Sequence, residues 1–61
     1  MKTAMFKDEK DATKYGVTCS DTGEVKAEEL REGISYVTVI FPCVEINGVP
    51  KSLFDIEDLG D

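Results

Sequence analysis

The most regular alternation of side chains along this chain lies in residues 35–46, "SYVTVIFPCVEI". In an extended strand, successive side chains point to opposite faces. The segment therefore carries two rows, and both are largely apolar: Val37, Val39 and Phe41 on one side, Tyr36, Thr38 and Ile40 on the other. This pattern predicts a central strand that is covered on both faces.

Residues 47 and 48, Asn-Gly, follow this strand directly. Asn-Gly between apolar residues favours a two-residue type I′ turn, which needs positive φ at both central positions. The sequence therefore predicts a hairpin with strands near 35–46 and 49–56. The turn fixes a register with Ile46 opposite Val49, Cys43 opposite Ser52, and Phe41 opposite Phe54.

Two prolines interrupt the predicted hairpin. Proline has no backbone N–H to donate, so within sheets it marks bulges, bends or edges. We expect Pro42 to mark such an irregularity and Pro50 to start the returning strand as an edge.

The N-terminal half gives weaker patterns. Residues 1–6, "MKTAMF", suggest a short strand. Residues 7–15 carry acids early and Lys14 late, and Gly16 follows, which suits a short helix with a complemented dipole. A solvated loop is the alternative for this segment. Residues 16–19, "GVTC", predict a brief strand.

Residues 24–32, "EVKAEELRE", are ambiguous. Strong helix formers, Asp21 and Glu24 in capping-box spacing, and Gly33 as a stop favour a short helix. The alternative is a strand through Val25 followed by a single helical turn.

These elements predict one small domain spanning residues 1–61. A chain of this length lies near the lower limit for independent folding and supports a stability of only about 3–5 kcal/mol. The expected fold class is α+β: an antiparallel sheet built on the 35–46/49–56 hairpin, with one or two short helices.

A second fold is suggested by "DTGEV", "YVTVIF" and "SLFDIEDL" in that order. Over residues 21–59 this succession resembles the strand order of small SH3-like and Tudor-like barrels. The resemblance implies an all-β SH3-like barrel as the alternative fold. The chain has no tryptophan and no evident aromatic cage, so the resemblance transfers no peptide or methyl-lysine recognition.

The net charge of the chain limits the classes of molecule that are expected to bind it. Thirteen acidic residues face seven basic ones, for a net charge of −6. Nucleic acids and anionic membranes bind through Lys and Arg, so neither is expected to bind this chain directly. A protein with a basic surface, or a site that normally receives nucleic acid, is the better electrostatic match.

The sequence lacks the residue patterns of several kinds of catalytic and ligand-binding site. The sequence has no histidine, its two cysteines lie 24 positions apart, and its glycines occur singly. The usual nucleophile–histidine pairs, zinc ligand sets and phosphate-binding loops are therefore not expected. We predict a non-enzymatic protein with no metal and no cofactor.

The N-terminal segment "MKTAMFKDEKD" has no apolar run of the length that a signal peptide or membrane span needs. This predicts a cytoplasmic protein. In a reducing compartment Cys19 and Cys43 are expected as free thiols, with a disulfide as the alternative.

The acidic residues gather in residues 24–32 and 55–61. Like charges at helical spacing add nothing to folding. The simpler interpretation of these acidic clusters is a solvated surface. The alternative is a surface arranged to bind a basic partner. The expected partner-binding residues are Glu28, Glu29, Glu32, Asp55, Glu57 and Asp58, with Tyr36 as an aromatic anchor.

The function predicted from these features is an acidic protein-binding module. Its inhibitory form is a phage-type inhibitor that docks on a basic, nucleic-acid-binding surface of a host protein, an analogy of size and composition. The alternative is a structural or accessory subunit that assembles through its apolar sheet, and that alternative leaves homo-oligomers open.

Overall fold

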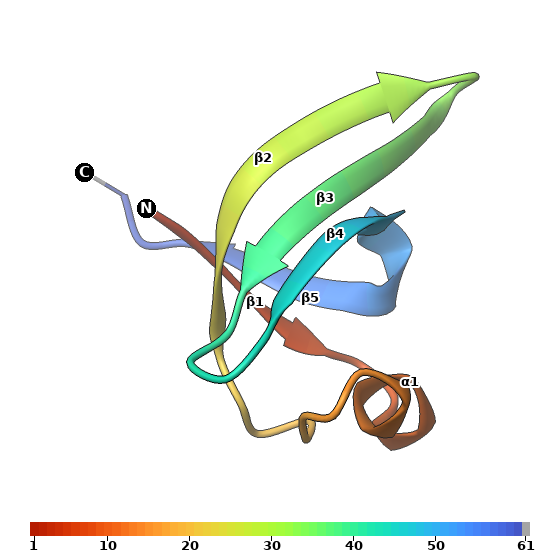
Figure 1. Ribbon diagram of the computed structural model, residues 1–61. Coiled ribbons are helices and arrows are strands. Elements are labelled where there is room, and N and C mark those ends of the chain that lie inside the picture. The colour runs from red at the N-terminus through yellow and green to blue at the C-terminus, as the bar shows by residue number, and fades with distance from the viewer. Residues whose placement is uncertain (61) are drawn as a thin grey trace.

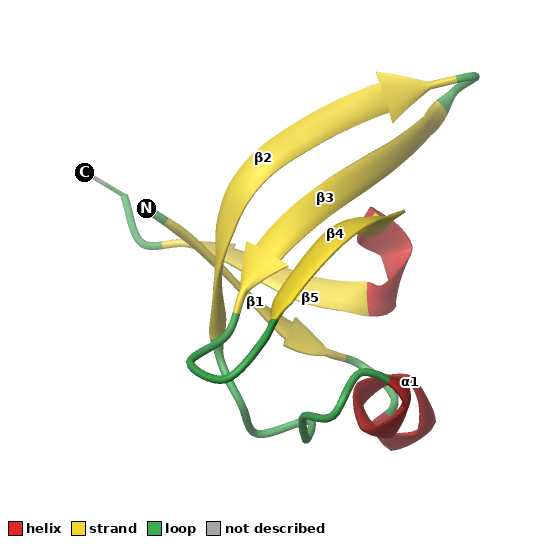
Figure 2. Cartoon of the chain, in the orientation of Figure 1, coloured by secondary structure: helices red, strands yellow, loops and turns green. Residues whose placement is uncertain are grey.

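The computed structural model describes residues 1–60. Five strands form one antiparallel sheet in the order β4-β3-β2-β1-β5, with one short α-helix and one 3-10 turn (Figures 1 and 2). In chain order the elements are β1 (Lys2–Phe6), α1 (Glu9–Lys14), β2 (Gly23–Arg31), β3 (Ile34–Ile40), β4 (Glu45–Pro50), η1 (Lys51–Leu53) and β5 (Phe54–Asp58).

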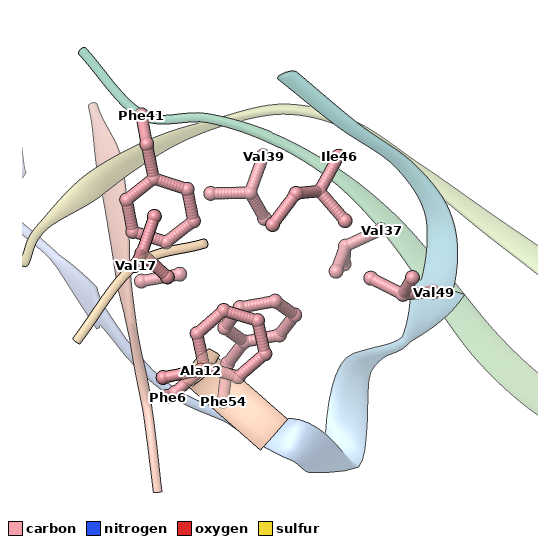
Figure 3. Packing of buried hydrophobic residues seen from close by; sticks show 10 residues of the cluster. Phe6, Ala12, Val17, Val37, Val39, Phe41, Ile46, Val49 and Phe54 are labelled. Atoms are coloured by element: carbon pink, nitrogen blue, oxygen red, sulfur yellow. The ribbon is translucent and has the colours of Figure 1, made fainter. Parts of the chain in front are cut away.

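The sheet curves so that one side encloses the core, which we call the inner face; the opposite side is the outer face. Figure 3 shows the valines of β3 and β4 across the core from Phe6 and Phe54. The buried cluster consists of Ala4, Phe6, Ala12, Val17, Val37, Val39, Phe41, Ile46, Val49 and Phe54.

The aromatic ring of Phe6 lies at the centre of this core. Its centroid is 4.4 Å from that of Phe54, 5.9 Å from that of Phe41 and 5.7 Å from that of Tyr15. The predicted cross-strand pair of Phe41 with Phe54 is therefore wrong, because β5 pairs with β1. Phe41 and Phe54 each contact Phe6 instead.

Residues 23–31 form strand β2, so the predicted helix over residues 24–32 is wrong. The segment pairs with β3 along its whole length, and tertiary pairing overrides the helix propensity of its residues. A bulge between Val25 and Ala27 adds Lys26 to β2 without a partner. Bulges bend a strand and increase its twist, and β2 curves strongly in Figure 1.

The tight hairpin turn lies at Glu32-Gly33, between the paired residues Arg31 and Ile34. Both turn residues have positive φ, 52° and 79°, as a type I′ turn requires. Glutamate rarely adopts this backbone conformation, so the residue type at position 32 does not predict the turn.

The predicted hairpin of 35–46 with 49–56 is wrong, because Asn47 and Gly48 lie inside β4. Val37 pairs with Val49 and Val39 with Ile46, so β4 has one extra residue here. Gly48 has a φ of 63° and forms part of this bulge. The positive φ that glycine allows is used for a bulge instead of a turn.

Strands β3 and β4 are joined by a loop at Phe41–Val44. The N–H of Phe41 donates to the carbonyl of Val44 at 2.8 Å, and Pro42 lies within the turn. The expectation that Pro42 marks a bend is confirmed. Pro50 ends the edge strand β4 instead of starting a strand, and η1 follows it.

The helix predicted over residues 7–15 is confirmed, with bounds Glu9–Lys14. The carboxylate of Asp8 caps it by accepting from the Lys10 N–H at 3.0 Å. Gly16 follows with a φ of 84°, which suits a residue just past a helix C-terminus. The strand predicted at residues 1–6 is confirmed as β1, whereas the brief strand predicted at residues 16–19 is wrong, because these residues form no strand.

The antiparallel sheet and the single small domain agree with the sequence. The α+β class fits less well, because the helical residues are few and every strand belongs to one sheet. β3 is an interior strand with β4 and β2 on either side, while β2 is the middle strand of the sheet, and only the inner row of β3 is buried. Tyr36, Thr38 and Ile40 on its outer row are half-buried, so the prediction of two covered faces is wrong.

Candidate protein-binding face

Acidic side chains form a row across the outer face of the sheet. Cross-strand partners lie on the same face, and five partners follow one another across all five strands. From β4 to β5 they are Glu45, Ile40, Glu24, Thr3 and Glu57. Three of the five positions are thus glutamates, and we call this set the outer row.

Other polar and aromatic residues extend this face. Asp55 pairs with Met5 beside the outer row. At the other end of the face, Tyr36 lies between Glu29 of β2 and Pro50 of β4. The face therefore combines acids with half-exposed side chains such as Tyr36 and Met5.

Few cations neutralise the acids of the outer face. Lys26 lies 3.6 Å from the carboxylate of Glu24, and Arg31 lies 3.8 Å from that of Glu29. The guanidinium of Arg31 also lies over the ring of Tyr36, 4.6 Å from its centroid. Among residues 1–60, no ion pair involves Glu45, Asp55 or Glu57.

Glu28 has a different environment, because it shares the inner face with its partner Val37. Its two carboxylate oxygens accept from Lys51 at 2.6 Å and from Lys2 at 3.1 Å. The hydrogen bond from Lys51, followed by that from Lys2, lowers the pKa of Glu28. The ion pairs of Glu28 therefore connect η1 and β1 to the long strand β2, which is a structural role.

The remaining predicted residues lie apart from both sets. Glu32 is in the hairpin turn, and Asp58 is on the inner side of β5 opposite Lys2. The Asp58 carboxylate accepts from the Gly60 N–H at 3.0 Å and lies 4.0 Å from the N-terminal amine. Of the seven predicted residues, the structure thus brings Glu29, Tyr36, Asp55 and Glu57 onto the outer face.

Sequence reasoning missed Glu24 and Glu45 as members of one row. Their alignment depends on β2 being a strand and on the register of three neighbouring pairs. The alternation of Glu24 with Val25 was the available signal, but the bulge at Lys26 reverses that alternation further along β2.

A hollow of about 570 Å³ lies at the open end of the inner face, beside β5. It is lined by Lys7, Gly33, Ile34, Ser35, Lys51, Ser52, Phe54 and Ile56. Its wall thus combines apolar side chains of β5 with two lysines and two serine hydroxyls.

The two cysteines are free thiols in different surroundings. Burial raises the pKa of Cys19, and a hydrogen bond to Glu9 and the charges of Glu9, Asp8 and Asp11 raise it further. Cys43 is exposed in the loop after β3. Within residues 1–60, no group of His, Cys, Asp or Glu side chains has the arrangement of a metal site.

Comparison of the chain with protein-family models, curated proteins and solved structures finds no match. No helix in residues 1–60 has the length and apolar character needed to span a membrane.

Proposed function

We propose that this protein is a non-enzymatic, acidic protein-binding module that docks through its outer face on a basic surface of another protein. The observation that carries the proposal is the outer row, in which Glu45, Glu24 and Glu57 lie on alternate strands of one sheet.

The spacing of these charges supports the proposal. Neighbouring strands lie about 4.8 Å apart, so the three glutamates recur about every 10 Å across the sheet. The core beneath the sheet does not need these charges. A row of separated carboxylates suits a surface whose cations are also separated, such as one that normally receives the phosphates of nucleic acid.

The half-exposed side chains between the acids would supply apolar contact. Ile40 lies within the outer row, and Tyr36 and Met5 lie on either side of it. Acids at the rim of an interface act mainly on encounter rate, and buried aromatic or apolar anchors supply most of the affinity. We therefore assign steering to Glu24, Glu29, Glu45, Asp55 and Glu57, and anchoring to Ile40 and Tyr36.

A module of this kind inhibits by occupying the groove of its partner. This is the action proposed for a phage-type inhibitor of a host nucleic-acid-binding protein. We place it in the reducing cytoplasm, where Cys19 and Cys43 stay free thiols.

For the fold we propose an SH3-like barrel. The strand order β4-β3-β2-β1-β5, the bulged β2 that pairs with both β1 and β3, and η1 between β4 and β5 support this assignment. This fold assignment does not identify a ligand.

The test is affinity capture from host lysate with three baits: the parent protein, Glu57→Lys and Asp11→Lys. The two variants change the net charge equally, but Asp11 lies on α1, away from the outer face. We expect a partner that the parent and Asp11→Lys retain, that Glu57→Lys loses, and that salt or added DNA releases. Equal capture by all three baits would reject the outer face as the docking surface.

The second candidate is a structural subunit that assembles through apolar surface. It is favoured by Leu30 and Ile34 near the hairpin turn, which are 69% and 50% exposed. Apolar association persists at high salt, whereas electrostatic docking weakens. Size-exclusion chromatography of the pure protein at low and high salt separates the two: a larger species that persists at high salt supports assembly.

A further inference from the structure

Within residues 1–60, strand β5 has a strand neighbour on one side only, β1. Two backbone bonds continue the β1–β5 pairing beyond the strand ends: the Lys7 N–H donates to the Leu53 carbonyl, and the Leu59 N–H donates to the Met1 carbonyl. Backbone bonding groups alternate in direction along an antiparallel strand. The groups of Asp55 and Glu57 therefore point toward β1, and those of Ile56 and Asp58 point toward the free edge.

The other edge of the sheet, β4, is poorly suited to pairing. Its ladder is interrupted by the bulge at Gly48, and Pro50 has no N–H to donate. Bulges and prolines are the usual means by which an edge strand is protected. β5 contains neither within Phe54–Asp58, so the two edges differ in their capacity to accept another strand.

The two faces of β5 present different chemistry beside its free edge. Asp55 and Glu57 are exposed on the outer face. Ile56 and Phe54 on the inner face line the hollow of about 570 Å³, whose wall also carries Lys7 and Lys51. A strand laid along β5 would meet carboxylates on one face and an apolar hollow with lysines on the other.

We propose that the free edge of β5 accepts an extended segment of the partner protein, in which basic and apolar residues alternate. The basic side chains lie on the outer face beside Asp55 and Glu57. The apolar side chains enter the hollow, where a basic side chain would lose hydration and would meet the ammonium of Lys7. Main-chain hydrogen bonds run to Ile56 and Asp58, as in other cases of strand addition.

A second copy of this chain does not fit this edge well. Antiparallel pairing of β5 with itself would bring Asp55 and Glu57 of each copy close to those of the other. Like charges across strands are destabilising. The proposal rests on the proposed function for the source of the segment, but its geometry is tested separately.

The first test is hydrogen exchange of backbone amides with a synthetic peptide, acetyl-KVKIKVK-amide. In the free protein, the amides of Ile56 and Asp58 should exchange fast and those of Asp55 and Glu57 slowly. Saturating peptide should slow exchange at Ile56 and Asp58 by about tenfold or more. Peptide binding without this protection would overturn strand addition.

The second test removes the bonding groups of the peptide itself. In antiparallel addition to β5, the apolar peptide residues lie opposite Ile56 and Asp58 and bond to them, and the lysine N–H groups point away. N-methylation at the apolar positions should abolish binding, and the same number of methyl groups at lysine positions should leave it nearly unchanged. Equal effects of the two peptides would contradict the proposal.

A control separates this inference from the proposed function. A peptide with the same residues in non-alternating order, acetyl-KKKKVVI-amide, keeps its charge but cannot place all its lysines on the outer face of β5 and all its apolar residues on the inner face. It should bind more weakly than the alternating peptide by about tenfold. If both peptides bind alike and salt weakens both, strand addition fails while docking through the outer face stands.

Discussion

Glu28 and Glu57 are the same residue type in one sheet, yet their surroundings differ. Glu28 lies on the inner face and accepts from two lysines, at 2.6 and 3.1 Å. Glu57 lies on the outer face, and no ion pair involves it among residues 1–60. The Glu28 carboxylate stabilises contacts within the fold, whereas the Glu57 carboxylate faces solvent and is available to a partner.

Acidic residues that cluster in the sequence therefore do not mark a single binding surface. Glu28 and Glu29 are neighbours in sequence, but in a strand they lie on opposite faces. A cluster defined by sequence thus mixes structural and available charges. The register of the sheet separates them, and changes on the inner face should lower stability while changes on the outer face lower binding.

The largest loss of stability is expected from Phe6→Ala. Phe6 is 3% exposed and its ring packs against three other aromatic rings. The loss should be about 3–5 kcal/mol, comparable with the whole stability of a domain of this size. Circular dichroism at room temperature should therefore show a largely unfolded protein; a folded variant would contradict the central place given to Phe6.

Gly23→Ala is expected to have the next largest effect. A Cβ atom on Gly23 would lie 2.6 Å from Cγ1 of Val39 and 3.0 Å from the carbonyl oxygen of Ile40. Overpacking of this kind lowers the free energy of unfolding by about 1–3 kcal/mol. Urea unfolding measures it, and an unchanged midpoint would show that β2 and β3 separate more easily than the register implies.

Much of the fold could be predicted from sequence where local signals and tertiary structure agree. Strand β1, helix α1 and the interior position of β3 follow from alternation, capping residues and β-branched side chains. Pairing between distant segments carries no such local signal. The neighbours of β5 could not be predicted, because β5 pairs with the first strand of the chain.

The misassigned elements share a physical cause. Glu, Lys and Leu in residues 24–32 favour a helix locally, but a strand there packs Val25 partly buried against the core and completes the sheet. Asn47-Gly48 offered the positive φ of a turn, and the bulge in β4 uses it. The outer row depends on these same features, so it could not be derived from the sequence.

The hairpin turn between β2 and β3 offers a smaller, stabilising change. Glu32 has a φ of 52°, which asparagine tolerates better than glutamate. Glu32→Asn should raise the free energy of unfolding by about 0.5–1 kcal/mol. A lower thermal midpoint for this variant would argue against the type I′ assignment.

Glu28→Gln tests the structural carboxylate through pH. The pKa of Glu28 is lowered on folding, so its ion pairs stabilise the protein above the unfolded value of about 4.5. That contribution is lost as pH falls through the lower folded value. The variant should be less stable than the parent at neutral pH, and the difference should vanish in acid.

Glu57→Gln is the matched control on the outer face. It should change the free energy of unfolding at neutral pH less than Glu28→Gln does, because surface substitutions without partners usually stay within about 0.5 kcal/mol. Equal losses from the two variants would remove the distinction between structural and available acids.

The most direct test of the outer face is the rate of association with the captured partner. It is measured at low and high ionic strength for the parent, Glu57→Lys and Asp11→Lys, two variants that change the net charge equally. We predict that Glu57→Lys associates slowly with a flattened salt dependence, whereas Asp11→Lys stays closer to the parent. An unchanged rate for Glu57→Lys at every ionic strength would contradict docking through the outer face.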